Sequence, residues 1–170
     1  MIKEGDGSIA YDSGEHGTHC CGTVAGGKAK RIRIGMAPEA GLLAGLVLKG
    51  GSGTDAQILA GMQWAIQRKA DVISMSLGGF SMTPDVMDTC SRTIITANRL
   101  GIPVVVAMGN DGHQTSGAPG NDFFAFGAGA TDVQDRAAGF SGGRTQIIAK
   151  SRFIDDRYLP LVYRKVQVFM

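Results

Sequence analysis

Short apolar runs alternate with helical patterns along this chain, and this alternation limits the folds open to it. Four runs, residues 41–48, 71–77, 102–107 and 123–130, have the length of buried strands. Runs this continuous are typical of strands that are covered on both faces, as in a parallel sheet flanked by helices. The sequence therefore predicts the α/β class, with a parallel sheet and helices on its faces.

Two helical patterns separate these strands, over residues 54–69 and 83–100. Each begins with a residue pair that favours a helix start, and the second is followed by a glycine that favours a helix end. These residues are Thr54 with Gln57 (a capping box), Thr83 with Pro84, and Gly101.

Glycine-rich segments follow the predicted strands, where ligands bind in parallel sheets. They are Gly50–Gly53, Leu77–Phe80 and Gly109–Gly112. Exposed backbone in three such loops suits the binding of an extended peptide chain. The alternative is that these glycines only turn the chain.

Composition excludes several classes of protein. The formal net charge is +2, which excludes a generally basic, nucleic-acid-binding surface. No apolar run reaches the length of a membrane span, so we expect no membrane association. The three cysteines do not favour a disulfide framework, because their number is odd. The N-terminus has no apolar stretch like that of a signal peptide, and localisation is left unknown.

Charge is distributed unevenly along the chain. Residues 1–143 hold 11 basic and 13 acidic side chains, whereas residues 144–170 hold 6 basic and 2 acidic ones. We therefore expect residues 144–170 to form a basic C-terminal tail that differs from the body of the chain.

The segment around His16 and His19 carries the sharpest local signal for chemistry. If it opens a helix, the two histidines share one face, and a neutral histidine there could act as a general base. A pair of buried, hydrogen-bonded histidines is an equally simple alternative. His16, His19 and Cys20 could also bind a metal ion, although no fourth ligand follows at zinc-like spacing.

Asn110 lies just beyond the predicted strand that ends at Ala107. A side-chain amide at the carboxyl end of a strand can donate a hydrogen bond to an oxyanion. An asparagine that merely tolerates a tight turn is the alternative.

Taken in chain order, these segments resemble the catalytic domain of the subtilisin-like serine proteases, the subtilases. The resemblance covers residues 10–143 and implies a subtilisin-like three-layer α/β/α fold, here truncated at both ends. The blocks that carry it are His16–Thr23, Gly35–Ala40, Gly51–Gly53, Ser76–Gly79, Asn110, Gly117–Gly120 and Ala130–Ser141.

The resemblance implies a role for each matching residue. His16 falls on the catalytic histidine, and Asn110 falls on the asparagine of the oxyanion hole. The remaining site residues would bind an extended polypeptide substrate, either along its backbone or around the side chain before the scissile bond, in the S1 pocket. They are Gly51, Ser52 and Gly53 for the backbone, Ser76, Leu77 and Gly78 for the wall of S1, and Gly117 for its base.

No cofactor is implied for the chemistry. Many subtilases bind structural calcium, but no acidic cluster in this sequence is convincing enough to name its ligands. The sequence therefore assigns no metal-binding residue.

Two parts of the family's triad, which runs Asp, His, Ser along the chain, do not match. Asp12, within the tripeptide Asp12–Gly14, imitates the triad aspartate but lies only four residues before His16, where the family commonly has another acidic residue. The nucleophile block Gly-Thr-Ser-Met-Ala is absent. We therefore expect residues 1–143 to be a partial catalytic domain and the chain alone to be inactive.

Two further functions are open at this point. A truncated or degenerate subtilase could act only as a peptide-binding module. A small metal-binding or redox domain could use His16, His19, Cys20 and Cys21.

Overall fold

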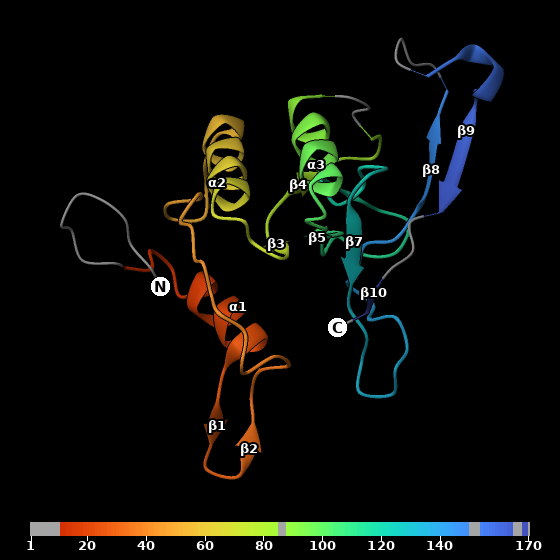
Figure 1. The fold of residues 1–170 in the computed structure, drawn as a ribbon. Coiled ribbons are helices and arrows are strands. Elements are labelled where there is room, and N and C mark those ends of the chain that lie inside the picture. The colour runs from red at the N-terminus through yellow and green to blue at the C-terminus, as the bar shows by residue number, and fades with distance from the viewer. Residues whose placement is uncertain (1–10, 85–87, 150–153, 165–167, 170) are drawn as a thin grey trace. The chain divides into compact units, whose positions relative to one another are not determined.

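In the computed structural model, residues 11–84, 88–149, 154–164 and 168–169 are described. The chain divides into two compact units, Met1–Arg68 and Lys69–Met170. The first unit holds two helices and a small hairpin, and the second holds the main sheet (Figure 1).

In the first unit, helix α1 (His16–Ala25) leads into the antiparallel strands β1 (Lys28–Ala29) and β2 (Ile32–Arg33), and helix α2 (Asp55–Gln67) comes last. The predicted capping box of α2 is confirmed. The Thr54 side chain accepts a hydrogen bond from the Gln57 amide, and the Gln57 side chain accepts one from the Thr54 amide at 2.8 Å. Both bonds satisfy amides that the first helical turn leaves free.

The prediction of a strand over residues 41–48 is wrong. These residues form no ladder in the structure, and only an isolated bridge joins Lys49 to Ser52 beyond them. A strand requires a partner for its backbone groups, and an apolar run does not supply one. Several side chains of the run are exposed, including those of Leu43 and Leu46.

The second unit contains a four-stranded, all-parallel sheet, which confirms the predicted α/β class. Its strands are β3 (Ile73–Met75), β5 (Val104–Ala107), β7 (Phe126–Gly129) and β10 (Val168–Phe169), in the order β10-β7-β5-β3. Three of the four apolar runs therefore contain sheet strands, each shorter than its run. β5 lies between β3 and β7, and the side chains on one of its faces, Val104 and Val106, are fully buried, whereas Val105 and Ala107 are half-buried.

Helix α3 (Thr89–Arg99) of the second unit begins later than predicted. Asp88, not Thr83, is its N-cap, and the Asp88 carboxylate accepts a 2.6 Å hydrogen bond from the Ser91 amide. A carboxylate satisfies a free helix amide and also interacts favourably with the positive end of the helix dipole, which explains the preference. Residues 85–87, part of the predicted helix, lie outside the described residues. The predicted end is confirmed, because Gly101 follows the helix with φ of 81°.

The core of the second unit forms where α3 packs on the sheet. Ile94 and Ala97 of α3 and Val104 and Val106 of β5 are fully buried. Met108, just beyond β5, is also fully buried, so the exit of this strand is held firmly. The loop that follows Met108 thus starts from a fixed point.

Two smaller antiparallel pairs complete the second unit. β4 (Gly79–Phe80) pairs with β6 (Gly117–Ala118), and β8 (Thr145–Ile148) pairs with β9 (Leu161–Arg164), with a short 3-10 helix, Asp156–Tyr158, between β8 and β9. Within the part of the chain that the structure describes, no helix is long and apolar enough to cross a membrane.

Residues 144–170, predicted as a separate tail, contain β8 and β9 and also β10, which pairs with β7. Tyr163 of β9 donates a hydrogen bond from its hydroxyl to the Asn121 carbonyl at 2.8 Å. Burial and the charge of Asp122 raise the pKa of Tyr163, which keeps the hydroxyl protonated as a donor. The boundary near residue 143 stays a prediction.

Candidate functional site

His16 is the first residue of α1, and its side chain is exposed. One turn further along the helix, the Cys20 sulfur lies 3.6 Å from His16 Nε2. The histidine block does open a helix, which is the condition for His16 and His19 to share one face, and the imidazole is accessible to solvent. An exposed imidazole can accept a proton from a reacting group near neutral pH.

Asp12 caps the helix on which His16 lies. One carboxylate oxygen, Oδ2, accepts hydrogen bonds from the Thr18 hydroxyl and from the Thr18 amide, both at 2.7 Å, and Oδ1 accepts one from the Gly14 amide at 3.2 Å. The bonds from Thr18, first that of its hydroxyl and then that of its amide, lower the pKa of Asp12. Asp12 thus stabilises the first turn of α1, and its role as a triad partner stays untested.

The predicted backbone-binding strip, Gly51, Ser52 and Gly53, begins within a tight turn, which an isolated bridge between Lys49 and Ser52 closes. Gly50 and Gly51 have φ of 65° and 81°, and the Gly50 amide donates a 3.0 Å hydrogen bond to the Ser13 hydroxyl. All three residues of the strip are exposed. Gly50 and Gly51 thus form a turn, and the role of the exposed strip in binding substrate stays a prediction.

The segments predicted as the wall and the base of the S1 pocket lie side by side in the second unit. Strands β4 and β6 pair antiparallel, with Gly79 opposite Ala118. A Cβ built on Gly78 would lie only 2.7 Å from the Ala118 carbonyl oxygen, and one on Gly117 would lie 3.3 Å from the Gly79 carbonyl oxygen. Glycine at both positions lets the two backbones approach this closely.

A buried hydrogen-bond network behind this pairing was not predicted from the sequence. The Ser116 hydroxyl donates to the Ser81 carbonyl at 2.5 Å, and the Asn121 side-chain amide donates to the same oxygen at 3.2 Å. Ser116 and Asn121 are each 1% exposed. In such a buried position each satisfied bond resists separation of the two strands, because breaking it leaves a polar group unpaired.

Asn110 is exposed in the turn after β5, which starts from the buried Met108. Backbone bonds hold this turn from two sides. The Gly117 amide donates to the Met108 carbonyl at 2.9 Å, and the Gly142 amide donates to the Gly109 carbonyl at 2.9 Å. The loop that carries the predicted oxyanion donor is therefore fastened directly to the predicted base of S1.

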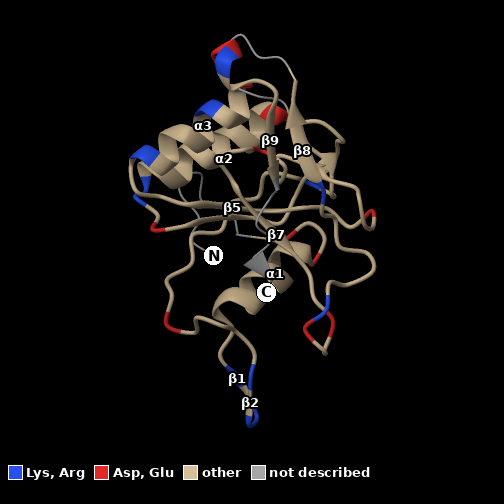
Figure 2. Cartoon of the chain, turned by 90° about the vertical axis from the view of Figure 1, so that its right-hand side faces the viewer, with Lys and Arg blue, Asp and Glu red and all other residues tan. Residues whose placement is uncertain are grey.

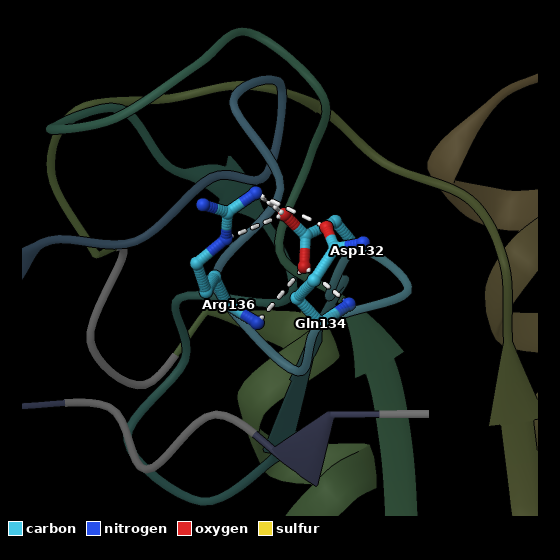
Figure 3. Close-up of polar contacts among 3 residues, drawn as sticks. All are labelled: Asp132, Gln134 and Arg136. Carbon is cyan, nitrogen blue, oxygen red and sulfur yellow. Dashed lines mark hydrogen bonds and ion pairs between the residues drawn. The ribbon is translucent and has the colours of Figure 1, made fainter.

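The loop after β7 is closed by a separate polar cluster. Asp132 accepts hydrogen bonds from the Gln134 amide at 2.9 Å and from the Arg136 amide at 3.1 Å, and it forms an ion pair with the Arg136 guanidinium at 2.8 Å (Figure 3). The Arg136 side chain, followed by its amide, lowers the pKa of Asp132. This loop is an ordered turn, with Thr131 bridged to Ala137.

The predicted site residues are divided between the two units. Ser76, Leu77, Gly78, Asn110 and Gly117 belong to the second unit. Among the described residues, no three His, Cys, Asp or Glu side chains come together as a metal site. The first unit contributes the other predicted residues, which are His16, Gly51, Ser52 and Gly53.

The parallel sheet, the helix packed on it and the glycine-rich loops beyond its strands define an α/β protein. Two solved structures share this fold, the protease domain of PatA (TM-score 0.70, 21% identity, 78% of this chain and 50% of that chain) and the prenylagaramide maturation protease PagA (TM-score 0.63, 23% identity, 76% and 47%). The sequence profile of the subtilase family, peptidase S8, matches residues 2–154. The chain belongs to the subtilase family.

Named serine proteases are among its relatives. The chain is 35% identical over 150 residues to an intracellular serine protease of Paenibacillus polymyxa, and 40% identical over 142 residues to the serine protease AprX of Bacillus subtilis strain 168. These matches cover 85% and 75% of this chain but only 45% and 32% of the relatives. The chain thus spans less than half the length of either protein.

Proposed function

We propose that the chain is part of the catalytic domain of a serine endopeptidase, with His16 as general base and Asn110 as oxyanion donor. The observation that supports this most is the assembly in the second unit. There the paired strands β4 and β6 bring Gly78 close to Ala118, and Gly117 is hydrogen-bonded to the exit of β5, just before Asn110. Independent loops that only turned the chain would have no reason to converge in this way.

In the proposed reaction, His16 accepts the proton of a serine hydroxyl as that oxygen attacks the peptide carbonyl. The negative charge that develops on the carbonyl oxygen is stabilised by the side-chain amide of Asn110. Because Asn110 is exposed and its loop is fastened on both sides, the amide is accessible without large reorganisation. No cofactor takes part, and no calcium ligand is assigned.

The substrate is a polypeptide in extended conformation. The exposed strip Gly51–Gly53 and the segment Ser76–Gly78 each offer backbone groups with which such a chain can pair. Its side chain before the scissile bond enters S1, whose proposed wall is Ser76–Gly78 and whose proposed base is Gly117. We propose no nucleic-acid or membrane partner for this surface.

The 170-residue chain by itself is proposed to be inactive, because none of its serines lies in a Gly-Thr-Ser context. A serine hydroxyl is a weak nucleophile unless an oriented base takes its proton. The second candidate function is a peptide-binding module without cleavage. The exposed strip Gly51–Gly53 and the pairing of β4 with β6 support it, since neither needs a nucleophile to bind a peptide.

A chimaera tests the proposal. Residues 11–143 replace the matching segment of AprX, which supplies the remainder of its own catalytic domain, and hydrolysis of a fluorogenic peptide is measured. Replacing His16 by alanine should reduce kcat by several powers of ten. The matched control is His19→Ala, on the same helix, which should retain most of the activity. Equal losses for both histidines, or no loss for His16→Ala, would contradict the assigned base.

A further inference from the structure

The hairpin β1–β2 carries an unusual concentration of positive charge. Four of the chain's 17 basic residues lie within Lys28–Arg33, and the chain as a whole has a net charge of only +2. Figure 2 shows blue on both strands of this hairpin. All six residues of the segment are exposed. The basic residues are Lys28, Lys30, Arg31 and Arg33.

The charges oppose the formation of the hairpin that carries them. The register places Lys28 directly opposite Arg33, and like charges at such a cross-strand pair are destabilising. Lys30 and Arg31 fill the turn, where Lys30 has φ of 57°. Among the described residues, no carboxylate lies within ion-pair distance of any of the four cations. The positive charge is therefore uncompensated within the described chain.

The hairpin is firmly fastened to the C-terminal end of α1. The Gly35 amide donates to the Gly26 carbonyl at 2.8 Å, and the Ala37 amide donates to the Val24 carbonyl at 2.7 Å. No Cβ would fit on Gly35, because it would overlap the backbone of Gly26. The cations are thus presented from an ordered base and not from a loose loop.

Apolar side chains alternate with the cations over residues 31–34, which include β2. Ile32 and Ile34 are 72% and 52% exposed, and they occupy the positions between and after Arg31 and Arg33. The sheet has only two strands, so each strand has one outer edge with unpaired backbone groups. An edge of this kind can accept an added strand.

We propose that the hairpin β1–β2 binds an extended acidic segment of a polypeptide, in which carboxylates alternate with apolar side chains. Alternate residues of an added strand lie about 6.6 Å apart on one face, so carboxylates at alternate positions can reach Arg33 in β2 and Arg31 in the adjoining turn. The carboxylates would pair with the cations, and the apolar side chains would cover Ile32 and Ile34. This binding is separate from peptide-bond cleavage and needs none of the proposed catalytic residues.

Two other roles, protection against aggregation and binding of nucleic acid, explain the basic residues of this hairpin less well than peptide binding does. A lysine on an edge strand can prevent aggregation, but that role does not require a pair of cations directly opposite each other. A nucleic-acid duplex is engaged through many phosphate contacts, and four cations on one small hairpin of a nearly neutral chain offer few.

Fluorescence anisotropy with the 170-residue chain tests the proposal. The probe is a labelled nonapeptide in which glutamate alternates with valine, and the comparison peptide has glutamine in place of glutamate. The acidic peptide should bind more tightly, and its affinity should fall at least tenfold between 50 mM and 500 mM salt, since exposed charge pairs are screened. The double variant Lys28→Gln/Arg33→Gln should weaken binding by about tenfold.

A matched variant and a stability measurement separate binding from structure. Lys69→Gln/Arg99→Gln removes the same charge from exposed positions elsewhere and should leave the affinity unchanged. In the absence of peptide, Lys28→Gln/Arg33→Gln should keep or raise Tm at low salt, because it removes a repulsive pair. Equal loss of binding in both double variants would overturn the proposal. So would tighter binding of a single-stranded oligonucleotide than of the acidic peptide, or aggregation of the hairpin variant with unchanged affinity.

Discussion

Replacing Gly78 by alanine should force apart the two strands that form the predicted S1 walls. A Cβ at this position would lie 2.7 Å from the Ala118 carbonyl oxygen, whereas ordinary contact begins at about 3.4 Å, so the backbones must move by about 0.7 Å (3.4 − 2.7). The φ of Gly78, 158°, is also one that residues with a side chain rarely adopt. The neighbour is backbone, which cannot rotate away as a side chain could.

The magnitude follows from these two costs. Overpacking against a fixed neighbour costs about 1–3 kcal/mol, and the unfavourable φ adds roughly 1 kcal/mol. The free energy of unfolding should therefore fall by about 2–4 kcal/mol. With a urea slope of about 1–3 kcal/mol per molar for a protein of this size, the unfolding midpoint should fall by about 1 M or more.

The adjacent glycine provides the control for this experiment. A Cβ on Gly79 meets nothing within 4 Å, so Gly79→Ala should leave the midpoint almost unchanged. Urea unfolding of both variants, followed by circular dichroism, makes the comparison. Equal midpoints for Gly78→Ala and Gly79→Ala would show that the close approach of Gly78 to Ala118 does not exist in solution.

Three further predictions concern the site. In the chimaera with AprX, Asn110→Ala should lower kcat by roughly 10²–10³ with little change in KM, because the Asn110 amide acts on charge that exists only in the transition state. A raised KM at constant kcat would contradict this role. The pKa of Asp12 is lowered in the folded chain, so Asp12 contributes stability that is present above the ordinary pKa of 3.8 and is lost as pH falls through the folded pKa. Asp12→Asn should therefore reduce helix content at neutral pH and make helix content depend less on pH in acid. A pH titration by circular dichroism that is unchanged in the variant would contradict the bond from Asp12 to α1. Gly53→Pro should weaken binding of a peptide aldehyde, because proline removes a backbone donor and restricts the chain; unchanged affinity would show that residues 51–53 only form a turn.

Local sequence signals predict those elements that depend on local contacts. The capping box of α2 joins Thr54 to Gln57, three residues away, and its hydrogen bonds are present. The start of α3 differs from the predicted one because two candidate caps are available, and the later one, Asp88, offers a charged acceptor to the Ser91 amide. The glycine after α3 ends the helix as expected, because its positive φ is costly for other residues.

The hydrophobic pattern of the sequence alone does not predict which segments pair over long distances along the chain. Residues 41–48 are as apolar as the runs that contain β3 and β5, yet they form no strand, because their composition does not supply a neighbouring ladder. The hydrogen bonds of Ser116 and Asn121 to Ser81 span 35 and 40 residues, and buried polar residues have no periodic signature. The positions of Gly78 and Gly117 in the site are expected only from the family resemblance, and the structure brings their strands together.

His16 is proposed as the catalytic base of a subtilase domain whose nucleophile is not among the serines of these 170 residues. A fluorophosphonate modifies activated serines, so labelling followed by intact-mass analysis probes both parts of this proposal at once. The 170-residue chain should remain unmodified, and the chimaera should take up one label at a serine that AprX supplies, with the label lost on His16→Ala but not on His19→Ala. Stoichiometric labelling of the 170-residue chain itself, or labelling of the chimaera that persists without His16, would contradict the proposal.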